Sequence, residues 1–335
     1  MFKFDGKAFA EMFFSVSGYE SPRNDANESI VFGRELEEIL AQSYDVKYVE
    51  NKARVLLPFN TAVSNAAASA TYRLFDESGS AAFVTDFADA DFPEVSASGT
   101  EFTTKFASIG NSYGYSIQDW REAMMAGRSL DMMKARAARN ALERKVETIA
   151  AVGDSLHNLV GVLNHASVPV LNTVTTPGVG LSGKVWVGTG ATATVLEMFQ
   201  DLAAAFRYSY NTTLTLEEMD TVVFPSTVFS MLKSTLFQPT YNTKTVLQAM
   251  LEANPWIKNV DVWVRCDTAS AAGKGRILLY RKAPEVLQFM LSQDFESFPP
   301  QVRGAKFTIQ NHMRVGGMQI RYPKAMVYLD GTDGG

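Results

Sequence analysis

Histidine is the first residue type to consider, because it serves both as a metal ligand and as a general base. The chain has three, His157, His165 and His312, and they form no His-x-x-x-His pair and no zinc motif. His157 and His165 share one loop and are close enough in sequence to approach a common point, but no third ligand is evident. We therefore interpret all three as structural or surface residues and predict no metal site.

A glycine-rich segment at 178–184 matches the spacing of a phosphate-binding loop, G-x-x-x-x-G-K. That loop needs a Ser or Thr after its lysine to reach magnesium, and it must open a helix whose amides meet the phosphate. Here Val185 follows Lys184, and the run Val-Trp-Val that begins there is typical of a strand. The sequence therefore predicts no nucleotide site.

Four acidic residues, Asp86, Asp89, Asp91 and Glu94, form a cluster that would attract a hard cation. The calcium-loop pattern is incomplete, because its glycine and its distal bidentate glutamate are missing. We interpret the cluster as a solvated loop tip or as a patch that meets a basic partner. No Gly-x-Ser-x-Gly elbow is present either, so we predict no catalytic residue, no cofactor and no enzyme activity.

The composition is that of an ordinary folded protein: 335 residues, 46% hydrophobic and 20% charged. A chain of this length usually divides into two lobes. The net charge of -5 lacks the basic surplus of proteins that grip DNA or RNA directly. Cys266 is the only cysteine, which excludes an intrachain disulfide and fits a reducing cytoplasm. The charged N-terminal stretch predicts neither a signal peptide nor a membrane span.

The N-terminal third predicts two segments with little core of their own. Residues 1–65 form an arm rich in aromatic residues, with a short helical pattern and an acidic side at 30–40. Residues 66–115 predict a long β-hairpin loop, with strands at 72–75, 82–85 and 101–109 and the acidic cluster at its tip. Two strands alone bury little apolar surface, so this loop should lean on something outside itself.

A helix at 117–126 and a longer one at 129–152 follow, the second capped by Ser129 and closed by Gly153. The long helix has two adjacent apolar stripes. We predict that its core contacts come from Leu130, Met133, Ala137, Ala141, Leu142 and Ile149. The polar side is predicted to hold Arg136, Arg139, Glu143 and Glu147.

The rest of the chain predicts a second, α/β lobe and a return to strands. Helical patterns at 195–208, 227–237 and 245–253 alternate with strands at 221–224, 260–265 and 276–280. The tail at 306–328 predicts strands again, with a turn at Gly316-Gly317.

The order of these parts resembles the major capsid proteins of tailed bacteriophages, whose shell fold is named for phage Hong Kong 97 and is shared with encapsulins. The phrases that carry the resemblance are Tyr72-Arg-Leu-Phe-Asp-Glu-Ser-Gly79, Tyr113-Gly-Tyr-Ser-Ile-Gln-Asp-Trp120, Leu130-Asp131, Gly161-Val-Leu-Asn164 and the segment 316–331. Their order, over nearly the whole chain, is the specific feature. The resemblance implies an α+β fold with an N-terminal arm (1–65), an extended β-hairpin loop (66–115), a peripheral domain (116–190 and 291–335) with a spine helix at 129–152, and an axial domain (191–290).

By this resemblance the chain is a structural protein that self-assembles into hexamers and pentamers and forms the icosahedral head around phage double-stranded DNA. It implies a portal partner, scaffold or decoration proteins, no membrane, no sequence-specific DNA binding, assembly in the host cytoplasm and a final place in the virion. Some relatives lock the shell with a lysine–asparagine isopeptide bond, but no local pattern identifies one here. The predicted inter-subunit contact residues are Phe2, Phe13, Phe14, Arg73, Asp76, Phe83, Asp86, Phe87, Asp89, Phe92 and Lys105.

Two alternatives remain open from the sequence. An encapsulin-like nanocompartment shell protein has the same fold but encloses protein cargo rather than DNA. A two-lobed cytoplasmic enzyme or ligand-binding protein would instead use the lobe at 190–290 to hold a small molecule. The contents of any shell separate the first alternative from a phage head, and tight small-molecule binding would favour the second.

Overall fold

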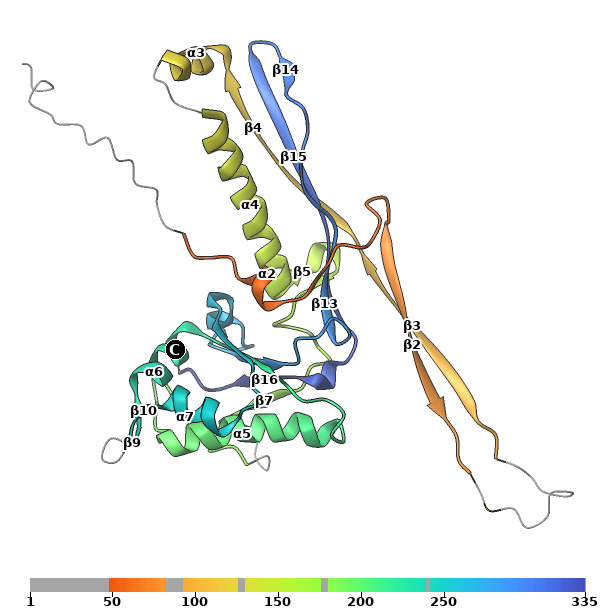
Figure 1. The fold of residues 1–335 in the computed structure, drawn as a ribbon, viewed down its shortest axis with the longest axis vertical. Helices are drawn as coiled ribbons and strands as arrows, with labels where there is room; N and C mark the ends of the chain where they lie inside the picture. The colour runs from red at the N-terminus through yellow and green to blue at the C-terminus, as the bar shows by residue number, and fades with distance from the viewer. Residues whose placement is uncertain are drawn as a thin grey trace, which may run out of the picture. The chain divides into compact units, whose positions relative to one another are not determined.

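The computed structural model describes residues 48–81, 83, 93–125, 130–175, 180–238 and 242–334 (Figure 1). The chain divides into the units Met1–Val49 and Glu50–Gly335, and the elements below belong to the second unit. Much of the predicted arm and of the hairpin tip therefore lies outside the described residues. This applies to the predicted contact residues Phe2, Phe13, Phe14, Asp86, Phe87, Asp89 and Phe92.

The first sheet is built around one long strand, β15 (Lys306–Ile320), which pairs antiparallel with three others. Those are β4 (Ala107–Ser116), β13 (Leu287–Ser297) and β14 (Gln301–Arg303), and β1 (Phe59–Asn60) is parallel to β13. Two helices follow β4 in the chain, α3 (Ile117–Met125) and α4 (Leu130–Val152). The short elements α2 (Ala53–Leu56), β5 (Gly153–Asp154) and β6 (Leu159–Val160) lie near the C-terminal end of α4.

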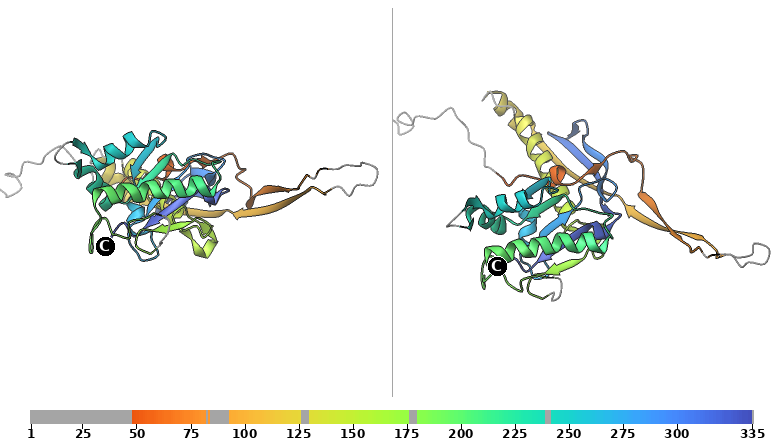
Figure 2. Two further views of the ribbon diagram at one scale, coloured as in Figure 1. Left: turned by 90° about the horizontal axis from the view of Figure 1, so that it is seen from below. Right: turned by 60° about the horizontal axis from the view of Figure 1, so that its bottom comes forward.

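The second sheet has the strand order β11-β8-β12-β16-β7. Its members are β11 (Asn259–Val262), β8 (Thr221–Phe224), β12 (Ile277–Tyr280), β16 (Met326–Asp330) and β7 (Val170–Asn172). Three helices belong to it, α5 (Val195–Thr212), α6 (Ser226–Ser234) and α7 (Val246–Ala253), together with the small pair β9 (Leu236–Gln238) and β10 (Asn242–Thr245). Figure 2 shows α5 running along this sheet.

The second sheet is buried on both faces, because its side chains alternate between two cores. One face packs with α5, α6 and α7 through Val222, Phe224, Ile277, Leu279, Val327 and Leu329. The opposite face joins α4 and the first sheet through Val223, Leu278, Tyr280, Met326 and Tyr328. The continuous apolar runs of β8 and β12 follow from this double burial.

Local signals explain where the helices of the second sheet begin. Thr194 accepts a hydrogen bond from the backbone of Glu197, whose carboxylate bonds back to the Thr194 amide, and Thr245 and Gln248 repeat the arrangement before α7. Each capping box satisfies amides that the first helical turn leaves without partners. The long helix ends where the sequence predicts, at Gly153, whose φ of 81° is left-handed.

The hairpin is shorter than the predicted loop at 66–115. Strands β2 (Ser69–Ser78) and β3 (Ser96–Lys105) pair antiparallel over their full lengths, from Ser69 opposite Lys105 to Ser78 opposite Ser96. The next ten residues form β4, which lies in the first sheet beside β15. The alternating pattern at 101–109 continues across this boundary, so only the partner strand reveals where the hairpin ends.

Only one of the two apolar stripes of α4 is buried. Leu142 and Ile149 are buried against the first sheet, whereas Met133 is 67% exposed and both Ala137 and Ala141 are exposed. The prediction that the Met133 stripe contributes to the core of the chain is therefore wrong; the side chain of Leu130 lies outside the described part. The physical reason is that β4 and β15 cover the side of α4 that carries Leu142, whereas the stripe of Met133, Ala137 and Ala141 stays open to solvent in the single chain.

This correction changes the expected effect of a charge on the exposed stripe. Met133→Asp should lower the free energy of unfolding of the unassembled subunit by no more than about 0.5 kcal/mol, the usual range for a surface substitution. Leu142→Asp, on the buried stripe, should cost several kcal/mol because it buries an unpaired charge. Urea denaturation of the two variants measures both effects. Equal losses of stability would show that the exposed side of α4 is misassigned.

The tail contains a further departure from prediction. Gly316 and Gly317 form no turn: they lie within β15 at an irregularity in its pairing with β13. A Cβ on Gly316 would come within 2.6 Å of the Phe106 ring, and Gly317 has a φ of 71° close to the backbone of Val160. In addition, β16 lies in the second sheet, whereas the rest of the tail strands lie in the first. Its long-range partner β12 decides this, not its own sequence.

The pairing irregularity at Gly316 and Gly317 allows a controlled test of how tightly the backbone of Val160 packs against Gly317. Gly317→Ala should cost about 2–3 kcal/mol, since it combines left-handed strain with tight contacts of 3.1–3.2 Å to Val160. Gly304→Ala is the matched control, because Gly304 also has a positive φ (62°) but no atom lies within 4 Å of its Cβ position. We expect the control to cost about 1 kcal/mol. Thermal melting of the two variants measures the difference, and equal shifts would contradict this packing at Gly317.

Candidate functional site

The three histidines, the first residues considered for chemistry, make local structural contacts. His157 Nδ1 lies 3.2 Å from the Asp154 carboxylate, and His165 Nδ1 accepts a hydrogen bond from the Ser167 amide. Burial lowers the pKa of His165 below its ordinary value, which favours its neutral form. The imidazole ring of His312 lies 6.4 Å from the ring of Phe298, which follows β13. Among the residues that the structure describes, no three His, Cys, Asp or Glu side chains gather as a metal site.

Cys266 and Lys184 are likewise engaged. Cys266 is buried, and burial raises the pKa of its thiol, so a reactive thiolate is disfavoured. Lys184 Nζ lies 2.7 Å from the Glu197 carboxylate at the start of α5, rather than open to a phosphate. Gly178, the first glycine of the predicted phosphate-loop match, lies outside the described residues.

The Lys184–Glu197 contact predicts a specific acid sensitivity. The hydrogen bond from Lys184, followed by those from Thr194, lowers the pKa of Glu197 to about 2. A carboxyl group whose pKa falls on folding stabilises the fold above its ordinary value near 4.5, and this contribution disappears as the pH falls towards 2. Glu197→Gln should therefore flatten the loss of melting temperature between pH 4.5 and 2. Glu122→Gln, at an exposed site on α3, is the control, and identical acid profiles for Glu197→Gln and the unmodified chain would contradict the contact.

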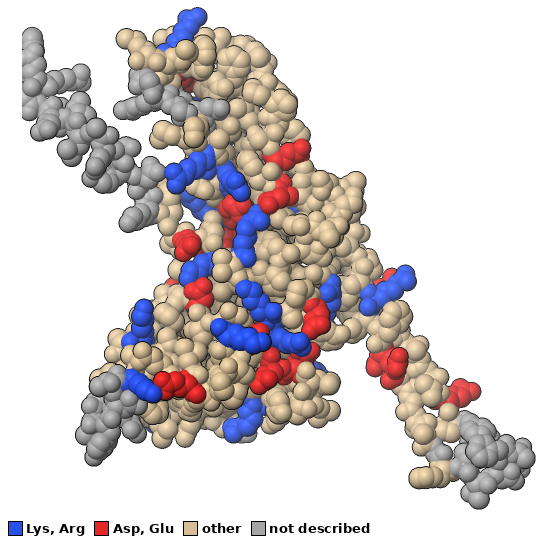
Figure 3. Space-filling view, in the orientation of Figure 1, with Lys and Arg blue, Asp and Glu red and all other residues tan. Residues whose placement is uncertain are grey.

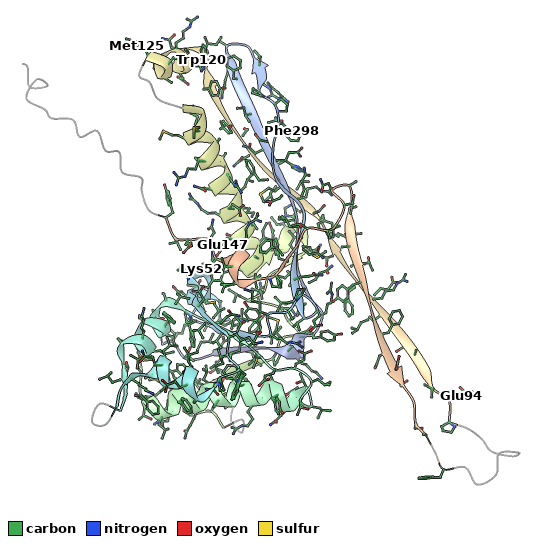
Figure 4. All side chains as sticks on the ribbon, viewed as in Figure 1. Lys52, Glu94, Trp120, Met125, Glu147 and Phe298 are labelled. Carbon is green, nitrogen blue, oxygen red and sulfur yellow. The ribbon has the colours of Figure 1, made fainter. Side chains whose placement is uncertain are left out.

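The β2–β3 hairpin presents side chains that its own chain leaves uncovered. Phe75 is 71% exposed, Val95 and Phe83 are also exposed, and Figure 4 shows Glu94 towards the outer end. Among the predicted contact residues, Asp76 and Lys105 are exposed. Several large apolar side chains exposed on one hairpin are typical of a surface that another molecule covers.

Within the hairpin, a few contacts hold the two strands together. The rings of Tyr72 and Phe102 stack at 5.2 Å, and Arg73 forms an ion pair with Glu101 at 2.7 Å. Arg73, another predicted contact residue, is therefore engaged within its own hairpin while staying exposed. Cross-strand pairs of this kind stabilise a two-stranded ribbon modestly.

The attachment of the hairpin to the body is confined to its base. The Tyr72 hydroxyl donates to the Ile320 carbonyl at 3.4 Å, and Gln319 Nε2 donates to the Thr104 hydroxyl at 3.2 Å. The Arg321 guanidinium lies over the Tyr72 ring. Beyond these residues Figures 1 and 2 show the hairpin extending away from both sheets. The first sheet therefore fixes the direction of the hairpin, while its outer part has no support from the described chain.

A second group of exposed apolar side chains lies at the end of the first sheet that carries α3. Figure 4 places Trp120 and Met125 on α3, and both are exposed. The side chains of Met124 on α3, Met132 and Met133 on α4, Phe298 and Val302 are also exposed. Methionine is flexible and polarizable, which suits a surface that must fit a partner closely. Apolar side chains are thus exposed on α3 and near residues 298–302 as well as on α4.

A buried carboxylate that the sequence placed on the polar side of α4 anchors the segment that enters the fold. Glu147 accepts hydrogen bonds from the amides of Lys52 and Ala53 and from the indole of Trp263. Figure 4 shows Lys52 and Glu147 beside each other where α2 meets α4, and Lys52 also pairs with Asp261 of β11. One carboxylate thus ties the entering chain to α4 and to the second sheet. Spacing along α4 gave no signal of this role.

The surface charge shows no single dominant field. In Figure 3, basic and acidic side chains lie interspersed over the visible face, in agreement with the modest net charge of -5. Interspersed charges set the register of a protein–protein contact more than its affinity. None of the described helices is both long and apolar enough to cross a membrane.

Comparison with known proteins agrees with this geometry. The family model described as "Major capsid protein" matches residues 79–332. No curated protein matches the sequence. Among solved structures, the capsid of Myoviridae phage XM1 is similar with a TM-score of 0.77 and 15% identity, covering 91% of this chain and 100% of that one.

Two further structures extend the similarity. The capsid of the native GTA particle has a TM-score of 0.60 and 12% identity, covering 91% of this chain and 99% of that one. A virus-like particle from Pyrococcus furiosus has a TM-score of 0.51 and 13% identity, covering 82% and 91%. At such identities the structural matches establish the α+β fold, which is the fold of phage capsids, and the family model establishes membership. This chain belongs to the major capsid protein family, whose members form the shell of the virion.

Proposed function

We propose that copies of this chain assemble into hexamers and pentamers that close into an icosahedral head around phage double-stranded DNA. The observation that carries the proposal is the β2–β3 hairpin, ten residue pairs long, whose outer half has exposed apolar side chains and no support from the described chain. A segment of this kind gains stability by lying on a neighbouring subunit. Long-lived interfaces of this type often bury more than about 2,000 Å².

The two sheets belong to different domains of the proposed capsid subunit. In this proposal the first sheet with α4 is the peripheral domain, and the second sheet with α5–α7 is the axial domain around the centre of each ring. The aromatic arm at 1–65 runs along adjacent subunits, with Phe2, Phe13 and Phe14 in contact. The hairpin contributes Arg73, Asp76, Phe83 and Lys105, and its tip contributes Asp86, Phe87, Asp89 and Phe92.

The proposal also includes the binding partners of the chain and the location where it assembles. A portal occupies one vertex, and scaffold or decoration proteins assist assembly in the host cytoplasm before the product becomes the head of a virion. DNA is enclosed without sequence-specific contact, consistent with a net charge of -5. Family and fold are those of a structural protein, and we propose no reaction for it.

Electron microscopy of the full-length chain, purified after expression alone and with its neighbouring phage genes, tests the proposal. We expect rings of five and six subunits and closed shells, and DNA inside shells formed in the presence of the packaging proteins. A protein that stays monomeric under all of these conditions contradicts assembly. Shells that consistently enclose an enzyme instead of DNA would favour the nanocompartment alternative.

A further inference from the structure

A cleft of about 450 Å³ opens beside α5, away from the hairpin and from the exposed surface of α3 and α4. Its walls are one side of α5, the turn that follows this helix and the turn that follows α7. Buried Phe206 and Met219 contribute apolar surface. Both the size and the largely apolar lining are typical of sites that hold a small molecule or one inserted side chain.

Aromatic rings from two separate elements face this cleft. Phe206 and Tyr210 lie one helical turn apart on α5, and Trp256 comes from the turn after α7. Tyr210 and Trp256 are partly exposed, so a ligand can reach them. Aromatic faces carry negative electrostatic potential and attract ammonium groups, most strongly where several rings meet.

Two carboxylates complete the lining, and they differ in availability. Glu217 accepts a hydrogen bond from Arg281 Nη1 at 2.7 Å, so it already has a cationic partner, which it shares with Glu285. Glu218 is exposed at the same cleft and has no ion-pair partner among the described residues. Arg207 of α5 also lines the cleft, and no ion pair joins it to Glu218 among the described residues. Glu218 is therefore a carboxylate beside the aromatic rings that no described cation pairs with, although the Arg207 guanidinium shares the lining.

The turn that presents Glu217 and Glu218 is conformationally strained. Leu214 and Thr215 have φ values of 52° and 70°, a region that residues other than glycine rarely enter. Hydrogen bonds hold the turn in place: the Thr215 amide donates to the Tyr210 carbonyl at 2.9 Å, and the Thr213 hydroxyl donates to the Ser209 carbonyl at 2.9 Å. Strain that the surroundings maintain in this way concentrates at binding sites.

We propose that this cleft binds an alkylammonium group, with its charge over the faces of Tyr210 and Trp256 and paired with Glu218. The group comes either from a free polyamine or from a lysine side chain of another protein chain, and both sources present the same chemistry. The proposal does not depend on assembly, because all three residues belong to one subunit.

Isothermal titration calorimetry on the full-length chain, at constant ionic strength, tests the proposal. The probes are spermidine for the free polyamine, N-acetyl-lysine amide for the side chain, and 1,6-hexanediol as a neutral analogue. We expect both cations to bind and the diol not to bind. Glu218→Gln should weaken cation binding about tenfold, the equivalent of one lost charge contact. Trp256→Ala should abolish it.

Glu122→Gln, which removes an exposed carboxylate on α3, is the matched control and should leave binding unchanged. Glu218→Gln alters one exposed group without disturbing the fold, so it remains decisive if Trp256→Ala does not fold. Tighter binding of spermidine supports the free polyamine, and tighter binding of N-acetyl-lysine amide supports an inserted lysine. Equal affinity of Glu218→Gln and the unmodified chain, or equal binding of the diol, would overturn the proposal.

Discussion

Replacement of residues 79–95 by Asn-Gly should abolish shell assembly and leave the subunit folded. Ser78 and Ser96 are paired across the hairpin, so a two-residue turn between them preserves the register of β2 and β3. The described residues of the removed segment, 79–81, 83 and 93–95, belong to neither hydrophobic core. The expected loss therefore falls on contacts with neighbouring subunits. Circular dichroism and thermal melting check the fold, and negative-stain microscopy with size-exclusion chromatography checks assembly.

A point variant distinguishes lost contacts from altered hairpin geometry. Phe75→Ser removes one exposed ring on β2 and keeps the chain length, and it should reduce the yield of closed shells without lowering the melting temperature. Thr71→Ser, a small change at an exposed position nearer the base of the same strand, is its control. Normal shells from the 79–95 replacement would show that the outer hairpin is dispensable and would remove the main support for its proposed contact.

Asp330→Ala should lower the free energy of unfolding by about 3–5 kcal/mol, because it leaves a buried guanidinium without its partner. Arg276 donates from Nε and Nη2 to the two oxygens of Asp330, both at 2.7 Å, and each side chain is only 7% exposed. The same guanidinium donates to the Leu163 carbonyl and lies 4.5 Å from the centre of the Tyr328 ring. The pair thus joins β12, β16 and the loop after β6.

Urea denaturation of the unassembled subunit measures this loss. Glu252→Ala is the control: it removes one partner of the exposed Lys244–Glu252 pair and should cost less than about 1 kcal/mol. The double variant Arg276→Met with Asp330→Leu should recover much of the stability, since a well-packed apolar pair avoids the desolvation of two charges. A similar small loss for Asp330→Ala and Glu252→Ala would mean that the Arg276 site is open to water.

Local patterns predicted most element positions well. The helix expected at 129–152 is α4, Leu130–Val152, and the strand expected at 221–224 is β8, Thr221–Phe224. These predictions rest on periodicity and caps, which are properties of neighbouring residues. The same patterns failed where a distant partner decides. The run at 101–109 divides between the hairpin and the first sheet, because β15 captures its second part.

The candidate surfaces show the same contrast. The exposure of Asp76, Phe83 and Lys105 was expected from a hairpin too long to bury itself. The apolar surface on α3 and α4 was not expected, because an apolar stripe on a helix has the same periodicity whether it meets its own core or another subunit. The cleft beside α5 could not be predicted from the sequence either, because its lining comes from two separate segments, 203–219 and 254–256.

The amino-acid sequence alone determined the order and type of the elements, the absence of a recognisable catalytic motif and the resemblance to a shell protein. Those properties depend on residue type, local spacing and order along the chain. Tertiary structure alone decided which stripe of α4 is buried, that Glu147 anchors the entering chain, and that Arg276 meets Asp330 54 residues later. The physical reason is that burial and charge pairing depend on which distant segment covers a side chain, and no local pattern contains that information.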